Sequence, residues 1–183
     1  MSAAPATAEV SPRPVAHDAA DARPFAVVDK RRATLAVYAA DGRLVGRAAT
    51  LLGLTPGDRE PASARGKAPS ALNTRERVTP AGRFEAVPGR NLSGERVVWF
   101  DYAANLAIHR LRPAPASERR RERLASDNLQ ERRITLGCVV VDPAFFDAVV
   151  LPTLGRGASL VYILPERDEA VAAGGGKSRT AAP

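Results

Sequence analysis

The fold and the candidate chemistry of this chain centre on one stretch, Arg133-Ile134-Thr135-Leu136-Gly137-Cys138-Val139-Val140-Val141. It contains the only cysteine of the 183 residues, Cys138, which follows a glycine and opens a run of valines. Consecutive β-branched residues favour a strand. A nucleophilic thiol needs a base that is close in space, though not in sequence. His109, which ends the apolar run from Asn105, is placed to serve, whereas His17 lies in a tail without a core.

Taken alone, Cys138 and His109 leave two interpretations open. A lone cysteine in a valine-rich strand is more often a small buried hydrophobe than a nucleophile. A histidine at a strand end is more often structural or exposed than catalytic. On its strand, His109 shares a face with Ala107 and not with the larger Ile108, and this placement suits a base that lines a cleft.

The wider pattern resembles the active-site motif of the L,D-transpeptidase catalytic domain, the YkuD-like family of enzymes that cross-link peptidoglycan. The family has an upstream histidine, followed later by Ser/Thr-His-Gly-Cys, an apolar residue and Asn or Arg. The matching positions here are His109, Thr135, Gly137, Cys138 and Val139. A second family block, Thr-Pro-x-Gly-x-Phe, resembles Thr79-Pro80-Ala81-Gly82-Arg83-Phe84. The resemblance covers roughly residues 25–165, about one ordinary domain.

Two positions depart from the family pattern. Leu136 stands where the motif has histidine, and Val140 stands where it has Asn or Arg. Cys138 follows His109 by 29 positions, which is longer than the common gap, and the extra length lies in an arginine-rich segment. The valine at position 140 cannot make the polar contacts of the family's Asn or Arg, so the specificity for the donor stem is open.

The resemblance implies a mainly β fold, a single β-barrel or sandwich domain with one or two short helices. It also implies a cysteine-dependent L,D-transpeptidase that forms cross-links or attachments through a thioester acyl-enzyme on stem peptides. Cys138 would be the nucleophile and His109 the base, and the main-chain carbonyl of Arg110 would orient the imidazole. Either His109 takes the thiol proton during attack, or the two groups rest as an ion pair. Main-chain donors at Leu136, Gly137 and Cys138 would stabilise the oxyanion.

Two further residues receive roles in this interpretation. Thr135 would hydrogen-bond within the motif loop, and Arg133 is a candidate contact for a substrate carboxylate. The sequence indicates no cofactor and no metal ligand set. With water as the acceptor, the same site would be an L,D-carboxypeptidase. A catalytically silent wall-binding module of the same fold is the other alternative; Leu136 and Val140 favour it, and the retention of both catalytic candidates opposes it.

Composition sets the domain organisation. The length predicts one domain, and we expect a disordered N-terminal segment at 1–23, the transpeptidase-like domain at 24–166 and a disordered tail at 167–183. The net charge is +7, with 27 Lys and Arg against 20 Asp and Glu. A basic surface favours anionic partners, but no element typical of nucleic-acid recognition is present.

The expected partners are therefore peptidoglycan stem peptides, without nucleic acid and without stable membrane insertion. No run of residues is long enough to span a membrane, and residues 1–21 lack the apolar core of a signal peptide. The resemblance nevertheless implies the periplasm or cell envelope. The oligomeric state, the export route and the identities of the two stems stay open.

Hydrophobic patterning predicts a series of strands, namely 25–29, 35–39, 44–52, 83–87, 96–101, 106–109, 139–141 and 159–164. The second of these alternates as a half-buried strand, and Asp41-Gly42 predicts a hairpin after it. Residues 53–73 read as a long loop that could flank the cleft. Turns are expected at 79–82, as a plain structural turn, and at 88–91.

Two helices are expected. Residues 117–125 form a short one with Ser117 as the N-cap, and its arginines are either a solvated face or a basic lip on the cleft. Residues 144–150 form the second, after Asp142 as N-cap and Pro143 at the first position. Trp99 is expected in the core rather than in the cleft.

Overall fold

Nine strands form the sheet in the described residues, 21–166, of this computed structural model. They are β1 (Phe25–Asp29), β2 (Thr34–Tyr38), β3 (Leu44–Gly53), β4 (Gly82–Arg90), β5 (Arg96–Asp101), β6 (Leu106–Arg110), β7 (Arg133–Thr135), β8 (Val139–Val141) and β9 (Ser159–Ile163). Their order is β2-β1-β9-β4-β5-β6-β8-β3-β7, and β2 also pairs with β3. That pairing closes eight strands into a barrel and leaves β7 beside β3. The predicted mainly β fold is confirmed.

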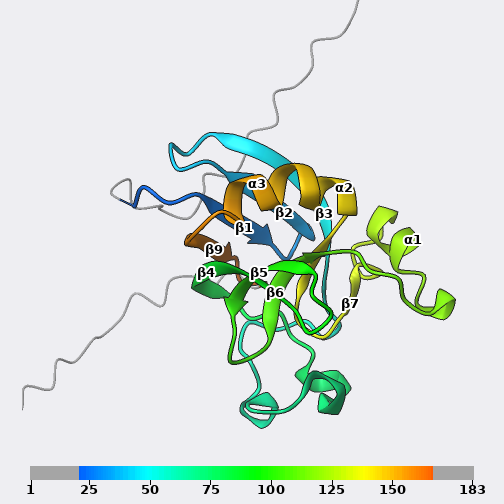
Figure 1. Ribbon diagram of the computed structural model, residues 1–183. Helices are drawn as coiled ribbons and strands as arrows, with labels where there is room; N and C mark the ends of the chain where they lie inside the picture. The colour runs from blue at the N-terminus through cyan, green and yellow to red at the C-terminus, as the bar shows by residue number, and fades with distance from the viewer. Residues whose placement is uncertain (1–20, 167–183) are drawn as a thin grey trace, which may run out of the picture.

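Helical elements accompany the barrel (Figure 1). α1 (Arg120–Ala125) lies at one side of it. A second segment runs from α2 (Pro143–Phe145) through a π turn, η5 (Phe146–Val150), into α3 (Leu151–Leu154). Short 3₁₀ turns occupy the loops: η1 (Ala62–Ala64), η2 (Pro69–Ala71), η3 (Thr74–Glu76) and η4 (Ala116–Glu118). None of the helices within residues 21–166 has the length and apolar character needed to cross a membrane.

One apolar core fills the barrel. Alternate side chains of the strands point inward, among them Val28, Val98 and Ile108, none of which is exposed to solvent. The helical segment adds Phe146 and Leu154 to the same core.

A second apolar cluster covers the outer face of β1, β2 and β9. Phe25 stacks on Tyr38 with ring centroids 4.7 Å apart, and it meets Tyr162 edge-on at 5.9 Å. The half-buried pattern predicted for 35–39 is therefore wrong, because β2 is covered on both faces. The alternation of residue types could not reveal this second cluster.

The strand β4 runs further than predicted. The turn expected at 88–91 is wrong, since Pro88 and Gly89 are still paired with β5. Pairing of β4 with β9 ends at Ala86, so Pro88 sits on a free edge where its missing N–H costs no ladder bond. The chain turns instead around Gly94, whose φ is +78°. The predicted hairpin at Asp41-Gly42 is confirmed, because β2 and β3 pair antiparallel across it.

Both predicted helices differ in detail. Ser117 lies in η4 and caps nothing, because Arg119 takes a left-handed conformation and α1 begins only after it. Asp142 does cap the second segment, where its Oδ1 accepts from the N–H of Ala144 at 2.8 Å. That segment continues past 150 to Leu154 although it contains Pro152. Proline cannot donate to the carbonyl four residues back, and the π turn of η5 lies directly before it.

Candidate active site

The candidate base and nucleophile lie on neighbouring strands. β6 and β8 pair in parallel, with His109 opposite Val140 and Ile108 opposite Val139. Since side chains alternate between faces, Cys138 and Val140 share the outer barrel face with His109. Ile108 and Val139 face the core. The fold therefore brings His109 and Cys138 onto one wall of the same cleft.

The surroundings keep His109 neutral and oriented. Its Nδ1 lies 2.8 Å from the main-chain carbonyl oxygen of Arg110. A carbonyl only accepts, so Nδ1 carries the proton and Nε2 presents a lone pair. Burial lowers the pKa of His109 from 6.5 to about 4, and the charges of Arg112 and Arg120 act in the same direction against the raising effect of the Arg110 carbonyl. At neutral pH the imidazole can accept a proton.

The thiol of Cys138 is protonated at rest. Burial raises its pKa, and the N–H of Ala107 and the charge of Arg112 offset only part of that rise. The thiol donates to the main-chain carbonyl of Asn105, with 3.5 Å between sulfur and oxygen. The directions of these two pKa shifts disfavour a resting ion pair between Cys138 and His109.

The loop before Cys138 is held by its own threonine. The Oγ1 of Thr135 donates to the carbonyl of Cys138 at 2.7 Å and accepts from the N–H of Gly137 at 3.1 Å. Gly137 has φ of +131°, and a Cβ there would lie 2.6 Å from the carbonyl oxygen of Val78. Only glycine fits this conformation and this space.

Thr79 ties the same loop to the interior. Its side chain is buried; Oγ1 accepts from the N–H of Gly53 at 2.9 Å and donates to the carbonyl of Gly137 at 2.9 Å. The block at 79–82 is thus more than the plain turn that the sequence predicts. Its threonine supports the motif loop directly.

The cleft itself has a volume of about 630 Å³. One wall is the loop between β3 and β4, which includes Lys67 and Glu76, as the sequence suggests for this region. Lys67 pairs with the buried Glu76 at 2.6 Å, and the main-chain N–H of Asn73 donates to the other carboxylate oxygen of Glu76 at 3.0 Å. The hydrogen bond from Lys67 lowers the pKa of Glu76 to about 2.

Arginines contribute to the opposite rim. Arg112 and Arg120 both line the cleft, each paired with an acidic neighbour, Glu95 at 2.8 Å and Glu118 respectively. The other arginines of α1 and its N-terminus do not line it. The arginine-rich segment is therefore mostly a solvated face with one side chain on the lip. Arg112 lies outside that cluster, and the sequence interpretation missed it.

Both departures from the motif, Leu136 and Val140, line the cleft. They differ in burial, because Leu136 is partly exposed. Val140 is almost fully buried and packs with Leu51 and with Leu124 of α1. The valine anchors the arginine helix to the outside of the barrel, beside the cysteine. Cys138 packs against the same apolar cluster, which contributes to the burial of its thiol.

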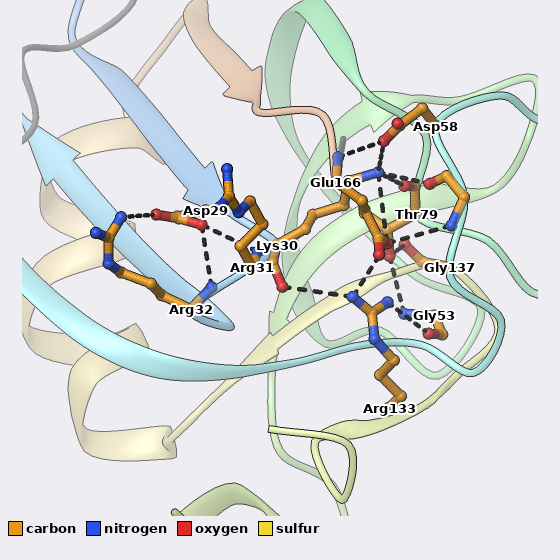
Figure 2. Close-up of polar contacts among 11 residues, drawn as sticks. Asp29, Lys30, Arg31, Arg32, Gly53, Asp58, Thr79, Arg133, Gly137 and Glu166 are labelled. Carbon is orange, nitrogen blue, oxygen red and sulfur yellow. Dashed lines mark hydrogen bonds and ion pairs between the residues drawn. The ribbon is translucent and has the colours of Figure 1, made fainter. Parts of the chain in front are cut away.

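A buried ion cluster lies behind the motif loop (Figure 2). The ammonium group of Lys30 has no solvent exposure and contacts Asp58 at 2.6 Å and the carbonyl of Thr79 at 2.9 Å. The carboxylate of Glu166 forms an ion pair with Arg133 at 3.0 Å. The main-chain N–H of Glu166 donates to the carboxylate of Asp58 at 2.8 Å. Charges removed from water in this way need complete pairing.

This cluster corrects the role suggested for Arg133. Its side chain is 8% exposed, pairs with Glu166 and donates to the carbonyl of Lys30 at 3.4 Å. It does not line the cleft. Arg133 is therefore structural, because its alternating position on β7 turns it into the protein and not toward a substrate.

Sequence reasoning also misplaced Trp99, which lines the cleft and is partly exposed. The signal available was the face alternation on β5, where Val98 and Phe100 take the inward positions. Within residues 21–166, no three His, Cys, Asp or Glu side chains gather in a way that could bind a metal ion.

Comparisons with known proteins address the fold. No protein-family model matches this sequence, and no curated protein matches it. Among solved structures, the chain is similar to the L,D-transpeptidase from Xylanimonas cellulosilytica, with a TM-score of 0.50 and 17% identity. The match covers 79% of this chain and 61% of that one. This chain has the L,D-transpeptidase fold.

Two further structures have lower TM-scores. They are the L,D-transpeptidase from Mycobacterium smegmatis (TM-score 0.45, 13% identity, 78% of this chain and 58% of that one) and the helical cell shape determining protein Pgp2 from Campylobacter jejuni (0.47, 16%, 80% and 48%). The chain thus spans about half to three fifths of the length of these proteins. The predicted resemblance to the L,D-transpeptidase domain is confirmed for the fold.

Proposed function

We propose that this protein is a divergent L,D-transpeptidase, a cysteine acyltransferase that acts on peptidoglycan stem peptides. One observation carries the proposal. A neutral imidazole, with Nδ1 held by the carbonyl of Arg110, shares a cleft wall with the cysteine of the chain. This arrangement suits proton transfer from a thiol to Nε2. A merely structural cysteine has no need of such a partner.

In the first half-reaction, Nε2 of His109 takes the proton as the sulfur of Cys138 attacks the carbonyl of an L,D peptide bond. The resulting oxyanion collapses and breaks the C–N bond. The leaving amine takes the proton from Nε2, and a thioester remains. In the second half-reaction, an acceptor amine loses a proton to Nε2, attacks the thioester and forms a new amide. The sulfur then regains that proton.

The oxyanion needs hydrogen-bond donors. The N–H of Gly137 is already bonded to Thr135, so the amides of Leu136 and Cys138 are the better candidates of the three. Arg112 and Arg120 replace Arg133 as proposed contacts for stem carboxylates, since both line the cleft. Such a substrate lies in the periplasm or cell envelope, and this is where the protein would act.

The test is the intact mass of the protein after incubation with a carbapenem. We expect one covalent adduct that is absent from Cys138→Ala and formed far more slowly by His109→Ala. His17→Ala is the matched control, because it removes the other histidine, and it should react at the original rate. Muropeptide analysis with donor and acceptor stems would then separate transpeptidation from hydrolysis to a carboxypeptidase product.

Absence of an adduct, together with slow alkylation of Cys138 by iodoacetamide at neutral pH, would contradict the proposal. The silent wall-binding alternative would then be favoured. Sedimentation of the protein with purified sacculi would test that alternative.

A further inference from the structure

The proposed acyl transfer does not use the two aromatic side chains at the end of β5. Trp99 and Tyr102 both line the cleft, and their ring centroids lie 5.2 Å apart in an edge-to-face arrangement. Tyr102 is 75% exposed, and neither ring belongs to an apolar core cluster. Exposed apolar surface inside a cleft often marks a binding site.

The neighbouring strand leaves room for the indole. A Cβ on Gly89 of β4 would lie 2.6 Å from Cδ1 of Trp99 and 2.7 Å from its Nε1. The indole therefore occupies the space that any other side chain at Gly89 would take. Val87, directly opposite Trp99 in the ladder, is 51% exposed and extends the apolar surface.

A polar rim borders this surface. The hairpin between β4 and β5 places Asn91, Leu92 and Ser93 along the same cleft, and Leu92 is fully exposed at its tip. Arg112 lines the cleft as well. An apolar platform bordered by hydrogen-bonding groups matches a pyranose ring, which has C–H groups on its faces and hydroxyl or amide groups on its edges.

The distance between the aromatic pair and the thiol predicts how long a bound stem has to be. Trp99 pairs with Ala107 on β6, and β6 pairs with β8, which follows Cys138. Two strand spacings separate the indole from the sulfur, about 10 Å. Three extended residues span about 10 Å, so a stem of about three residues would join a sugar at Trp99 to a carbonyl at Cys138.

We propose that Trp99 and Tyr102 form a subsite for an N-acetylhexosamine ring of the glycan, so that the donor binds as a stem still attached to its sugar. This inference rests on the proposed function for its substrate, but its binding step does not need the thiol. Trp99 would stack on one face of the ring, while Asn91 and Ser93 lie near its polar edge. A sugar-free peptide would lose these contacts.

The experiment uses the only tryptophan of the chain as the reporter. Oligomers of N-acetylglucosamine are titrated into full-length Cys138→Ala protein, and the emission of Trp99 is recorded. We expect a saturable change in intensity and wavelength. Since the nucleophile is absent, an inert thiol in the native protein would leave this result unaffected.

Variants locate the site. Tyr102→Ala removes an exposed ring, and Gly89→Ala displaces the indole. Each should raise the dissociation constant of the oligosaccharide by about tenfold or more, which corresponds to the loss of one good contact. Leu44→Ala is the matched control, because it removes an exposed apolar side chain on another strand, and it should bind as the parent does. Circular dichroism of each variant verifies folding, and Tyr102→Ala keeps the test valid if Gly89→Ala does not fold.

Two outcomes would overturn the subsite. The first is no saturable emission change with the oligosaccharide. The second is an equal change with a sugar-free stem peptide, which would make the platform a peptide contact. Either result leaves the carbapenem adduct on Cys138 unaffected, so failure of the sugar subsite and failure of the proposed chemistry are distinguishable.

Discussion

The imidazole of His109 stays uncharged at neutral pH because it is buried beside two arginines, while the carbonyl of Arg110 fixes its tautomer. The thiol of Cys138 stays protonated for a related reason, since burial disfavours its anion. In the proposed acyl transfer, the proton is therefore on the sulfur at rest, and His109 has to receive it during attack. The proposed reaction should for this reason be sensitive to the charge on His109.

The pH dependence of acylation follows from that proton. The pKa of His109 is about 4, so the base is neutral above this pH and is lost as the pH falls through it. We expect the rate of carbapenem adduct formation to be nearly flat from about pH 5 to 8 and to fall below about pH 4. Stopped-flow absorbance of the β-lactam measures it, with His17→Ala as control. A tenfold increase per pH unit between 5 and 8 would instead indicate a free thiolate and no role for His109.

Gly137 has the most restricted backbone near the sulfur. Replacing it with alanine forces a Cβ to 2.6 Å from the carbonyl oxygen of Val78 at a φ of +131°. We expect Gly137→Ala to lower the free energy of unfolding by at least ~3 kcal/mol and to abolish acylation. Gly42→Ala is the control, because its φ is also positive but its Cβ would meet nothing within 4 Å, and it should cost only ~1 kcal/mol.

Urea denaturation with mass spectrometry of the adduct measures both effects. Equal losses of stability in Gly137→Ala and Gly42→Ala would mean that the close approach to Val78 relaxes without cost. Normal acylation by Gly137→Ala would show that the loop geometry does not matter to the thiol.

Pairs of elements place the site, since no single element carries it. The parallel contact of β6 with β8 places His109 opposite Val140, two residues after Cys138. α1 docks on the same outer face through Leu124, which packs with Val140 and brings Arg120 to the cleft. The turn before β4 supplies Thr79, which joins the end of β3 to the motif loop.

A substitution that keeps the volume of Thr79 tests what its hydroxyl group contributes. Thr79→Val keeps the volume but leaves the N–H of Gly53 and the carbonyl of Gly137 without a partner. We expect a loss of ~2–4 kcal/mol in the free energy of unfolding, since each unsatisfied buried group costs ~1–3 kcal/mol. Acylation should slow by about tenfold, corresponding to ~1.4 kcal/mol of barrier.

Thr79→Ser is the matched variant, because it keeps the hydroxyl and removes only a methyl group. It should restore most of the stability and the acylation rate of the parent. If valine and serine variants acylate equally fast, the hydroxyl does not position the loop.

The buried ion cluster joins segments that are far apart along the chain. Lys30 follows β1, Asp58 lies in the loop after β3, Arg133 opens β7, and Glu166 follows β9. Each charge has its partners, so the barrel can close around them. The cluster connects both ends of the described domain to the loop that carries the cysteine.

We expect Lys30→Met to destabilise the whole domain by ~3–5 kcal/mol, because it removes the buried cation that pairs with Asp58 and leaves two main-chain carbonyls without its ammonium donor. Urea denaturation followed by circular dichroism measures the loss. Arg32→Met is the control for an exposed ion pair, with a side chain that is 68% exposed, and should cost at most ~1 kcal/mol. Similar losses in the two variants would mean that water reaches the cluster.

Most of the strands were predictable from their own residues. β1, β5 and β9 lie where apolar runs predict them, within one residue, because β-branched and aromatic residues favour strands locally. The candidate thiol and base, and the Asp142 cap, are also visible in the sequence as residue types with characteristic neighbours. The extension of β4 through Pro88 was not, because it depends on which of its edges is free.

Composition and local pattern are enough to predict a basic, mainly β chain with His109 in a strand and Cys138 directly before one. Tertiary structure alone decided that Arg133 is buried in an ion cluster, that Trp99 lines the cleft, and that Val140 anchors α1. The physical reason is the closed barrel. Closure gives every strand an inner and an outer face, and only contacts between distant segments determine what covers the outer one.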